Sequence, residues 1–407
     1  MDPATFCIDG NELTAWLRLL ETPGVGRTSA RRLLAAFGSP LGVFEAGRDG
    51  WRGVIAAAQV QALTQPPAGL DRLVERTLVW LANSNRRALV TLGDPNYPAS
   101  LLETADPPLL LYAEGRLDRL TQPALAVVGS RNPSAQGLAN ARAFSRALSA
   151  AGVVVVSGLA LGVDGAAHEG ALDAPPPTAA STIAVLGTGL DAVYPRRHLA
   201  LAGRIGEQGL LLSEYCLGTA PVANNFPLRN RVIAGLSLGT LVVEAALQSG
   251  SLITARLAAE AGREVFAIPG SIHSPQAKGC HALIKQGAKL VEDTQDILDE
   301  LQVLSSDRAG VAAARLLQGR VRAEATSPAP PATTPSPAPN ALEPPANPPD
   351  DADPVLRALG WSPATLEVLQ VRSGLSASEL SVRLLELELL GEVARLPGQL
   401  FQRQAAG

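Results

Sequence analysis

The middle of this 407-residue chain predicts an α/β fold, a Rossmann-like domain with a parallel or mostly parallel sheet. Apolar runs alternate there with helical patterns, which is typical of a parallel sheet covered by helices on both faces. The first apolar run leads through a turn of glycine, serine and arginine into a helical pattern at 134–151, as in a strand-to-helix unit. The expected strands are residues 125–128, 153–156, 183–186, 210–212, 241–243, 265–268 and 290–291.

Residues 1–85 predict a small all-α domain of the helix-hairpin-helix or SAM-like type. Gly24, Gly26 and Arg27 lie between two helical patterns, and a hairpin of this kind can offer backbone amides to a phosphate. The alternative is that both glycines only permit a tight turn between packed helices. The Rossmann-like domain and its lead-in segment are then expected at residues 86–305.

Residues 306–353 predict a Pro/Ala-rich linker, because such a segment cannot bury enough apolar surface to offset the entropy of ordering. Periodicity returns at 354–407, where helices at 364–371 and 377–390 and a following hairpin predict a winged-helix-like domain. Its second helix is acidic, with Glu379, Glu386 and Glu388 against Arg383. Since a helix that reads duplex DNA must enter a groove walled by phosphates, we expect this domain to contact protein instead.

The composition limits the partners and the compartment. A net charge of −4 argues against a protein that coats nucleic acid with its whole surface, so such binding requires a local cluster of arginines. No stretch approaches the roughly 20 apolar residues of a membrane helix, and the N-terminus lacks a signal-peptide pattern. We therefore expect a cytoplasmic protein without membrane contact. Cys7, Cys216 and Cys280 are too far apart to indicate a disulfide framework or a zinc site.

Three short segments place arginines, small residues and helix starts where an anion could bind. The first, Gly129, Ser130 and Arg131, follows the first predicted strand, where backbone amides and the helix dipole favour phosphate. The other candidates are Phe226, Arg229, Asn230 and Arg231 in the second segment, Ser249, Gly250 and Ser251 in the third, and Arg196 and Arg197 between the first two. Ligands of such sheets bind beyond the carboxyl ends of the strands, so the segments predict one positively charged groove for a polyanion.

Some of these residues have structural alternatives. Phe226 either stacks on a base or packs inside the fold, and Asn230 either touches the polyanion or orients its own loop. Arg196 and Arg197 could equally belong to a solvated helix turn.

The sequence gives little sign of catalysis or of a cofactor. The turn after the first strand lacks G-x-G-x-x-G, and Arg131 occupies the space that a pyrophosphate would need, so we expect no nicotinamide, flavin or other cofactor. We expect Asp164 to cap a helix and His168 to hydrogen-bond inside the fold. Glu244 is expected to anchor the Ser249–Ser251 loop through its amides. No catalytic residue and no metal ligand is predicted.

Several longer motifs occur in a defined order along the chain: Val127–Arg131, Ser157–His168, Gly187–Asp191 with Tyr194-Pro195, Phe226–Ser237, Val243–Ala245 and Ser249–Leu252. Together they resemble the DprA family, also called Smf, the bacterial DNA-processing proteins of natural transformation. The resemblance implies a protein that binds single-stranded DNA through its Rossmann-like domain, protects incoming DNA, forms a homodimer and helps to load the RecA recombinase. Apart from the resemblance, we expect no enzymatic activity, because the chain lacks a nucleophile elbow and a metal-ligand cluster.

Two other functions stay open. Rossmann-like enzymes that cut the N-glycosidic bond of nucleoside monophosphates carry a P-G-G-x-G-T-x-x-E segment, which Ser237–Glu244 echoes in part. The Pro-Gly-Gly start is absent, and the spacing from Gly239-Thr240 to Glu244 is one residue longer. The second alternative is a protein scaffold in recombination, which predicts no intrinsic affinity for DNA.

Overall fold

The computed structural model describes residues 8–175, 180–301, 353–360, 363–390, 392–396 and 400–403. It divides into two units, Met1–Thr294 and Gln295–Gly407. Residues 306–352 of the predicted linker, and the predicted domain end at 305, lie outside the described residues. None of the helices described is long and apolar enough to cross a membrane.

The first unit begins with five helices: α1 (Gly10–Glu21), α2 (Arg27–Phe37), α3 (Pro40–Trp51), α4 (Ala57–Leu63) and α5 (Leu70–Ala82). Capping side chains set two of the starts, since Asp9 accepts from the Glu12 amide and Ser39 from the Gly42 amide. Gly24 lies between α1 and α2 with φ +79°, a conformation that favours glycine. The predicted hairpin between two helices is therefore present, with Gly26 as the N-cap of α2.

Nine strands then form one sheet. They are β1 (Arg87–Thr91), β2 (Leu110–Gly115), β3 (Ala124–Val128), β4 (Val154–Ser157), β5 (Thr182–Val185), β6 (Leu210–Ser213), β7 (Gly239–Val242), β8 (Glu264–Ala267) and β9 (Lys289–Leu290). Their order is β1-β2-β6-β5-β4-β3-β7-β8-β9. The pairs β1–β2 and β2–β6 are antiparallel and the remaining pairs are parallel, so the mostly parallel, Rossmann-like sheet is confirmed.

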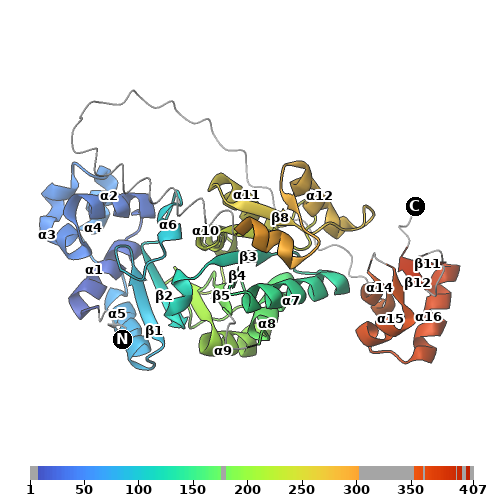
Figure 1. Ribbon diagram of the computed structural model, residues 1–407. Helices are drawn as coiled ribbons and strands as arrows, with labels where there is room; N and C mark the ends of the chain where they lie inside the picture. The colour runs from blue at the N-terminus through green and yellow to red at the C-terminus, as the bar shows by residue number, and fades with distance from the viewer. Residues whose placement is uncertain are drawn as a thin grey trace. The chain divides into compact units, whose positions relative to one another are not determined.

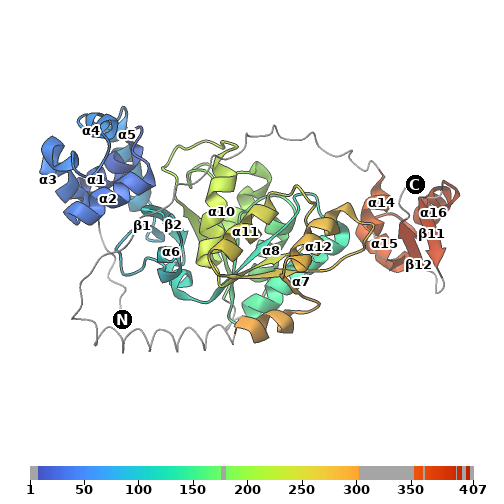
Figure 2. The same cartoon turned by 90° about the horizontal axis from the view of Figure 1, so that it is seen from above.

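Helices cover both faces of the parallel strands (Figure 1). On one face lie α7 (Ala135–Ala150), α8 (Val163–Leu172) and α9 (Leu199–Gln208), and on the other α10 (Asn225–Leu236), α11 (Ser251–Glu260) and α12 (Lys278–Lys285). Shorter elements are α6 (Ala99–Leu102) and the 3₁₀ turns η1 (Leu117–Thr121), η2 (Arg196–His198) and η3 (Pro275–Ala277). Seen from above, α1–α5 gather beside the β1–β2 hairpin (Figure 2), where Trp80 of α5 packs edge-on against Tyr112 of β2 with ring centroids 5.8 Å apart.

The strand order reverses at β3. The chain adds β4, β5 and β6 on one side of β3 and then returns to place β7 on its other side. The loops after β3 and β7 therefore leave the same edge next to each other. In open α/β sheets such a switch point, beyond the carboxyl ends of the strands, is where ligands bind.

The second unit has the winged-helix arrangement that the sequence predicts. Its elements are α14 (Pro354–Leu359), β10 (Ala364–Thr365), α15 (Leu366–Ser373), α16 (Ala377–Leu389), β11 (Val393–Leu396) and β12 (Leu400–Arg403), with sheet order β10-β12-β11. The helix expected at 364–371 instead begins at Leu366, because Ala364 and Thr365 pair with β12 and the Thr365 side chain caps the helix. Leu369, Leu380 and Leu384 lie in a core of this unit's own.

Candidate nucleic-acid interface

The turn after β3 is held firmly against the loop after β7. The Ser130 amide donates to the carbonyl oxygen of Glu244 at 2.7 Å, and the Asn132 amide donates to the Ser130 hydroxyl at 3.1 Å. Ser130 itself is buried, whereas Arg131 is exposed. The fixed turn thus presents the Arg131 guanidinium at the switch point, as the sequence predicts.

The start of α7, predicted as a phosphate site, holds a carboxylate of the protein itself. Glu244 accepts from the Ser134 amide at 2.9 Å and from the Ser134 hydroxyl at 2.5 Å, while that hydroxyl accepts from the Gly137 amide at 3.0 Å. The carboxylate complements the positive end of the helix dipole. The expectation that Glu244 anchors the Ser249–Ser251 loop is wrong, because its side chain binds the first loop instead.

Two other helices begin near this edge, and the N-cap residue of neither makes a side-chain cap hydrogen bond, although the Ser251 amide of α11 donates to the Ser249 hydroxyl at 3.4 Å. In α11 the N-cap is Gly250, and the hydroxyls of Ser249 and Ser251 are 2.7 Å apart. In α10 the N-cap is Asn224, which makes no side-chain cap hydrogen bond. In α11 the Leu252 and Ile253 amides donate to the carbonyl oxygens of Ser249 and Gly250, at 3.1 and 3.2 Å. What both helix starts offer a phosphate is therefore the positive end of a helix dipole.

Arg229, expected to line the groove, is buried with 4% of its surface exposed. Its guanidinium donates to the carbonyl oxygen of Val185 at the end of β5, and its charge acts on the buried Asp164 carboxylate. Burial lowers the pKa of Arg229 to about 10. This corrects its expected surface position, because the side chain turns into the sheet domain rather than toward solvent.

Arg231 and Arg27 are also engaged inside the molecule. Both contact the Glu214 carboxylate, Arg27 at 3.5 Å, and Arg27 also binds Asp106 at 2.6 Å. Arg31 of α2 binds Asp106 as well, at 2.6 Å. Burial would raise the pKa of Asp106, but the hydrogen bond from Arg31 and the charges of Arg27 and Arg231 lower it overall. We call these five residues the interdomain ion cluster, since they join α2 to the sheet domain.

The helix-hairpin-helix glycines, Gly24 and Gly26, are both exposed. The Gly24 carbonyl oxygen accepts from the Gln59 side chain of α4 at 2.8 Å. The turn is thus tied to α4, and Arg27 is engaged by Asp106 and Glu214, while both glycines lie on the surface.

Phe226 and Tyr194 form an aromatic pair near the carboxyl end of β5. Their ring centroids are 5.6 Å apart and their planes are tilted by 43°. Phe226 is half-buried, as is the neighbouring Asn230, and Tyr194 is 48% exposed. Arg196 and Arg197, both exposed, follow in η2. Tyr194, Arg196 and Arg197 thus lie on one short segment, and Tyr194 contacts Phe226 in the first turn of α10.

His168 and Asp164 have the internal positions expected of structural residues. The Thr182 hydroxyl donates to the Val155 carbonyl oxygen at 2.6 Å, so it accepts at 2.7 Å from Nδ1 of His168. Burial lowers the pKa of His168 to about 3, and the imidazole is neutral. Asp164 does not cap α8, whose N-cap is Gly162, and instead accepts from the Gly158 and Ala160 amides.

Sequence reasoning missed one exposed cation at this edge. Lys278 begins α12 after β8, and the amide of the next residue, Gly279, donates to the Ala245 carbonyl oxygen at 2.7 Å. That hydrogen bond brings the start of α12 to the loop after β7. A lysine at a helix start, following a predicted strand, was the available signal.

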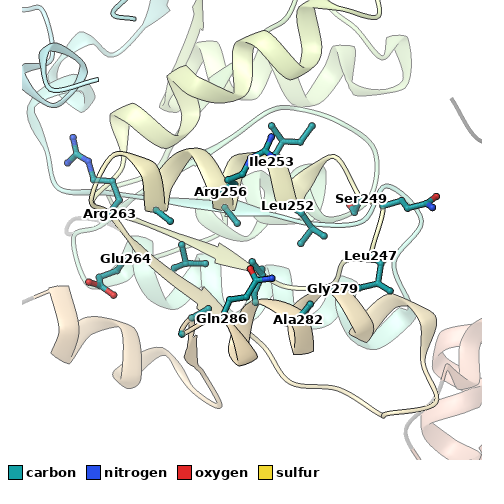
Figure 3. A pocket seen from close by; sticks show the side chains of 17 residues that line it. Leu247, Ser249, Leu252, Ile253, Arg256, Arg263, Glu264, Gly279, Ala282 and Gln286 are labelled. Carbon is teal, nitrogen blue, oxygen red and sulfur yellow. The ribbon is translucent and has the colours of Figure 1, made fainter. Parts of the chain in front are cut away.

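A cavity lies elsewhere on the sheet domain, between α11 and α12 (Figure 3). It measures about 600 Å³ and is lined mainly by apolar side chains such as Leu252, Ile253 and Leu283, with Arg256 and Gln286 at its sides. Among the candidate anion-binding residues, Ser249 is the one that lines it. The cavity is thus distinct in chemistry from the edge that carries Arg131.

Comparison with known proteins gives consistent matches. The family model of the DNA recombination-mediator protein A matches residues 88–302, and that of the DprA winged helix domain matches residues 327–399. Protein Smf of Escherichia coli is 43% identical over 80% of this chain and 79% of its own length, and Protein Smf of Synechocystis is 34% identical over 97% and 99%. The X-ray structure of DprA from Streptococcus pneumoniae superimposes with a TM-score of 0.60 at 38% identity, covering 70% of this chain and 97% of that one.

The matched region contains every strand of the sheet except part of β1. Since one family model spans more than half of the chain and a 43% identical relative spans four-fifths of it, this chain belongs to the DprA/Smf family, that of the DNA recombination-mediator protein A.

Proposed function

We propose that this protein binds single-stranded DNA along the carboxyl edge of its parallel sheet. The observation that carries the proposal is the switch point, where the exposed Arg131 lies on a turn fixed by hydrogen bonds and where α10 and α11 begin with the positive ends of their helix dipoles. Backbone amides and guanidinium groups contact phosphates without reading bases, so binding should tolerate different sequences. The proposed site comprises Gly129, Ser130 and Arg131, the loop at Ser249–Ser251, and the exposed Arg196, Arg197 and Lys278.

Binding rather than catalysis is supported by the state of the acidic side chains. Glu244 is the one acid that the glycosidase alternative would require, and both of its carboxylate oxygens bind Ser134. Asp164 is buried, accepts from the Gly158 and Ala160 amides, and interacts with the charge of Arg229. A general base must reach its substrate's proton, whereas both oxygens of Glu244 already accept hydrogen bonds from Ser134 and Asp164 is buried.

The test is an anisotropy titration of labelled oligodeoxynucleotides against the full chain. Arg131→Ala should weaken binding and lower the slope of log affinity against log salt by about 0.7, the value for one phosphate contact on a single strand. Arg204→Ala is the matched control, because Arg204 is an exposed arginine on α9 paired with Asp173. Tighter binding to duplex, or an equal loss in both variants, would reject the proposal.

Membership of the family also supports a place in recombination. We propose that the protein acts in the cytoplasm as a homodimer that protects incoming single strands and helps a RecA-type recombinase to load onto them. A strand-exchange assay in which the DNA is first covered by single-strand binding protein tests the loading step, and sedimentation tests the dimer. Recombination that proceeds at the same rate with and without this protein would contradict the proposed role.

A further inference from the structure

In the aromatic pair of Tyr194 and Phe226, Phe226 lies against the protein and Tyr194 is the more exposed ring. Phe226 is the inner ring: an added Cβ on Gly187 would lie 2.9 Å from its Cδ1 atom, so a glycine is needed for the ring to lie against the chain after β5. Tyr215 donates from its hydroxyl to the Asn225 carbonyl oxygen at 3.1 Å, which fixes the start of α10 just before Phe226. The Phe226 ring is therefore held by its close approach to Gly187 and by the hydrogen bond that fixes the neighbouring Asn225.

Tyr194 is the outer ring. It lies 5.6 Å from Phe226, within the range of favourable aromatic pairs, yet 48% of it remains exposed. Tyr194 is therefore a half-exposed aromatic side chain whose position is fixed by its contact with Phe226. Such a ring can stack on a nucleobase at little cost in side-chain entropy.

The surroundings favour a nucleic acid strand as the occupant. Gly187 follows β5, which is two strands from β3 in the sheet. At about 4.8 Å between neighbouring strands, the end of β5 lies roughly 10 Å from the end of β3, where Arg131 begins to project. The exposed Arg196 and Arg197 follow Tyr194 in the chain. Cations beside a stacking ring are the combination that single-strand-binding surfaces use.

We propose that Tyr194 stacks on an unpaired base of the bound strand, with Phe226 as the ring that supports it from behind. The proposal rests on the proposed binding of single-stranded DNA and assigns to Tyr194 the contact that the sequence suggested for Phe226. Phosphates would then be bound at Arg131, and one base would be held at the end of β5.

The experiment compares an ordinary oligodeoxynucleotide with one that carries a run of abasic sites, which keeps the phosphates and removes the bases. Tyr194→Leu should weaken binding of the ordinary strand by at least about fivefold, the lower end of what one base–aromatic stack contributes. On the abasic strand the same variant should bind within about twofold of the wild type. Tyr194→Phe retains the ring and should bind both strands as the wild type does.

Leu199→Ala is the matched control, since Leu199 is 64% exposed and lies five residues further along the same segment. Thermal unfolding of each variant verifies that it is folded. An equal penalty for Tyr194→Leu on both strands, or no penalty on either, would overturn the stacking role while leaving the proposed function in place. Failure of the wild type to bind any oligonucleotide would instead reject the proposed function, and this role with it.

Discussion

At the scale of single residues, burial separates arginines that the sequence places in similar motifs. Arg131 is exposed at a strand end, whereas Arg229 is buried beneath the same edge and donates to the Val185 carbonyl oxygen. A buried guanidinium is retained only when its donors and its charge are compensated. Arg229 therefore supports the loops that carry the site, and Arg131 is the side chain that can meet a ligand.

Matched methionine substitutions distinguish these two arginines. Arg229→Met removes the countercharge of the buried Asp164 and should destabilise the fold by about 3–5 kcal/mol. Arg131→Met should change the free energy of unfolding by less than about 0.5 kcal/mol and lower only the affinity for DNA. Chemical denaturation and anisotropy titration measure the two quantities. A stable Arg229→Met protein that no longer binds DNA would show that Arg229 contacts the ligand directly.

His168 makes the stability of the fold sensitive to acid. Its folded pKa, about 3, lies below its unfolded value, so the unfolded state takes up the proton first as pH falls. This contribution is intact above pH 7 and is lost progressively below the unfolded pKa of about 6.5, costing roughly 2 kcal/mol by pH 5. In His168→Asn, the fall in unfolding free energy between pH 7 and pH 5 should be smaller by that amount. Identical slopes for the two proteins would contradict the assignment of a neutral buried imidazole.

At the scale of elements, Glu244 couples two halves of the sheet. Its side chain holds the start of α7, which follows β3, although the residue itself follows β7. A carboxylate at a helix start accepts hydrogen bonds and also stabilises the helix dipole. Glu244 is therefore placed to hold the two neighbouring loops in register.

Glu244→Gln should cost about 1–3 kcal/mol of stability, because an amide has one acceptor oxygen and no charge. Affinity for a single strand should persist, since the substitution removes a negative charge from the edge that would hold phosphates. Denaturation and oligonucleotide titration give both values. Release of free base from nucleoside monophosphates by the wild type, abolished in this variant, would favour the glycosidase alternative instead.

Elements set by local sequence patterns could be predicted, whereas features that depend on contacts between residues far apart in sequence could not. Strands β3 to β9 were predicted from apolar runs, and β3 to β7 are buried throughout, as expected of parallel strands covered on both faces. The β1–β2 hairpin was missed, since its first strand is only partly buried and Gly93 and Pro95 break the pattern. Burial of Arg231 could not be predicted, because Asp106 is 125 residues away in sequence.

At the scale of the whole molecule, the interdomain ion cluster links the helical domain to the sheet domain. Arg27 and Arg31 of α2 meet Asp106, and Arg231 of α10 meets the buried Glu214. Helix α10 is thus tied at its centre to the N-terminal helices, while its first turn carries Phe226 at the proposed site. The Arg231–Glu214 pair is the most buried of these, with side chains 14% and 6% exposed, so breaking it by removing one partner should be costly. The other pairs are partly buried and reinforce the same arrangement of the two domains.

Removing the second unit should separate DNA binding from partner contact. The proposed binding residues all lie in the first unit, which has apolar clusters of its own, so a chain ending at residue 301 should bind oligonucleotides within about twofold of the full chain. A tethered module raises affinity only if it binds DNA itself. In α16, Glu379 and Glu386 are exposed, and the Arg383 charge is paired with Asp353 and Glu386.

We expect the truncation to alter recombinase loading instead. Loss of most DNA affinity in the truncated chain, with loading by pre-bound protein unchanged, would mean that the winged-helix module contacts DNA rather than protein.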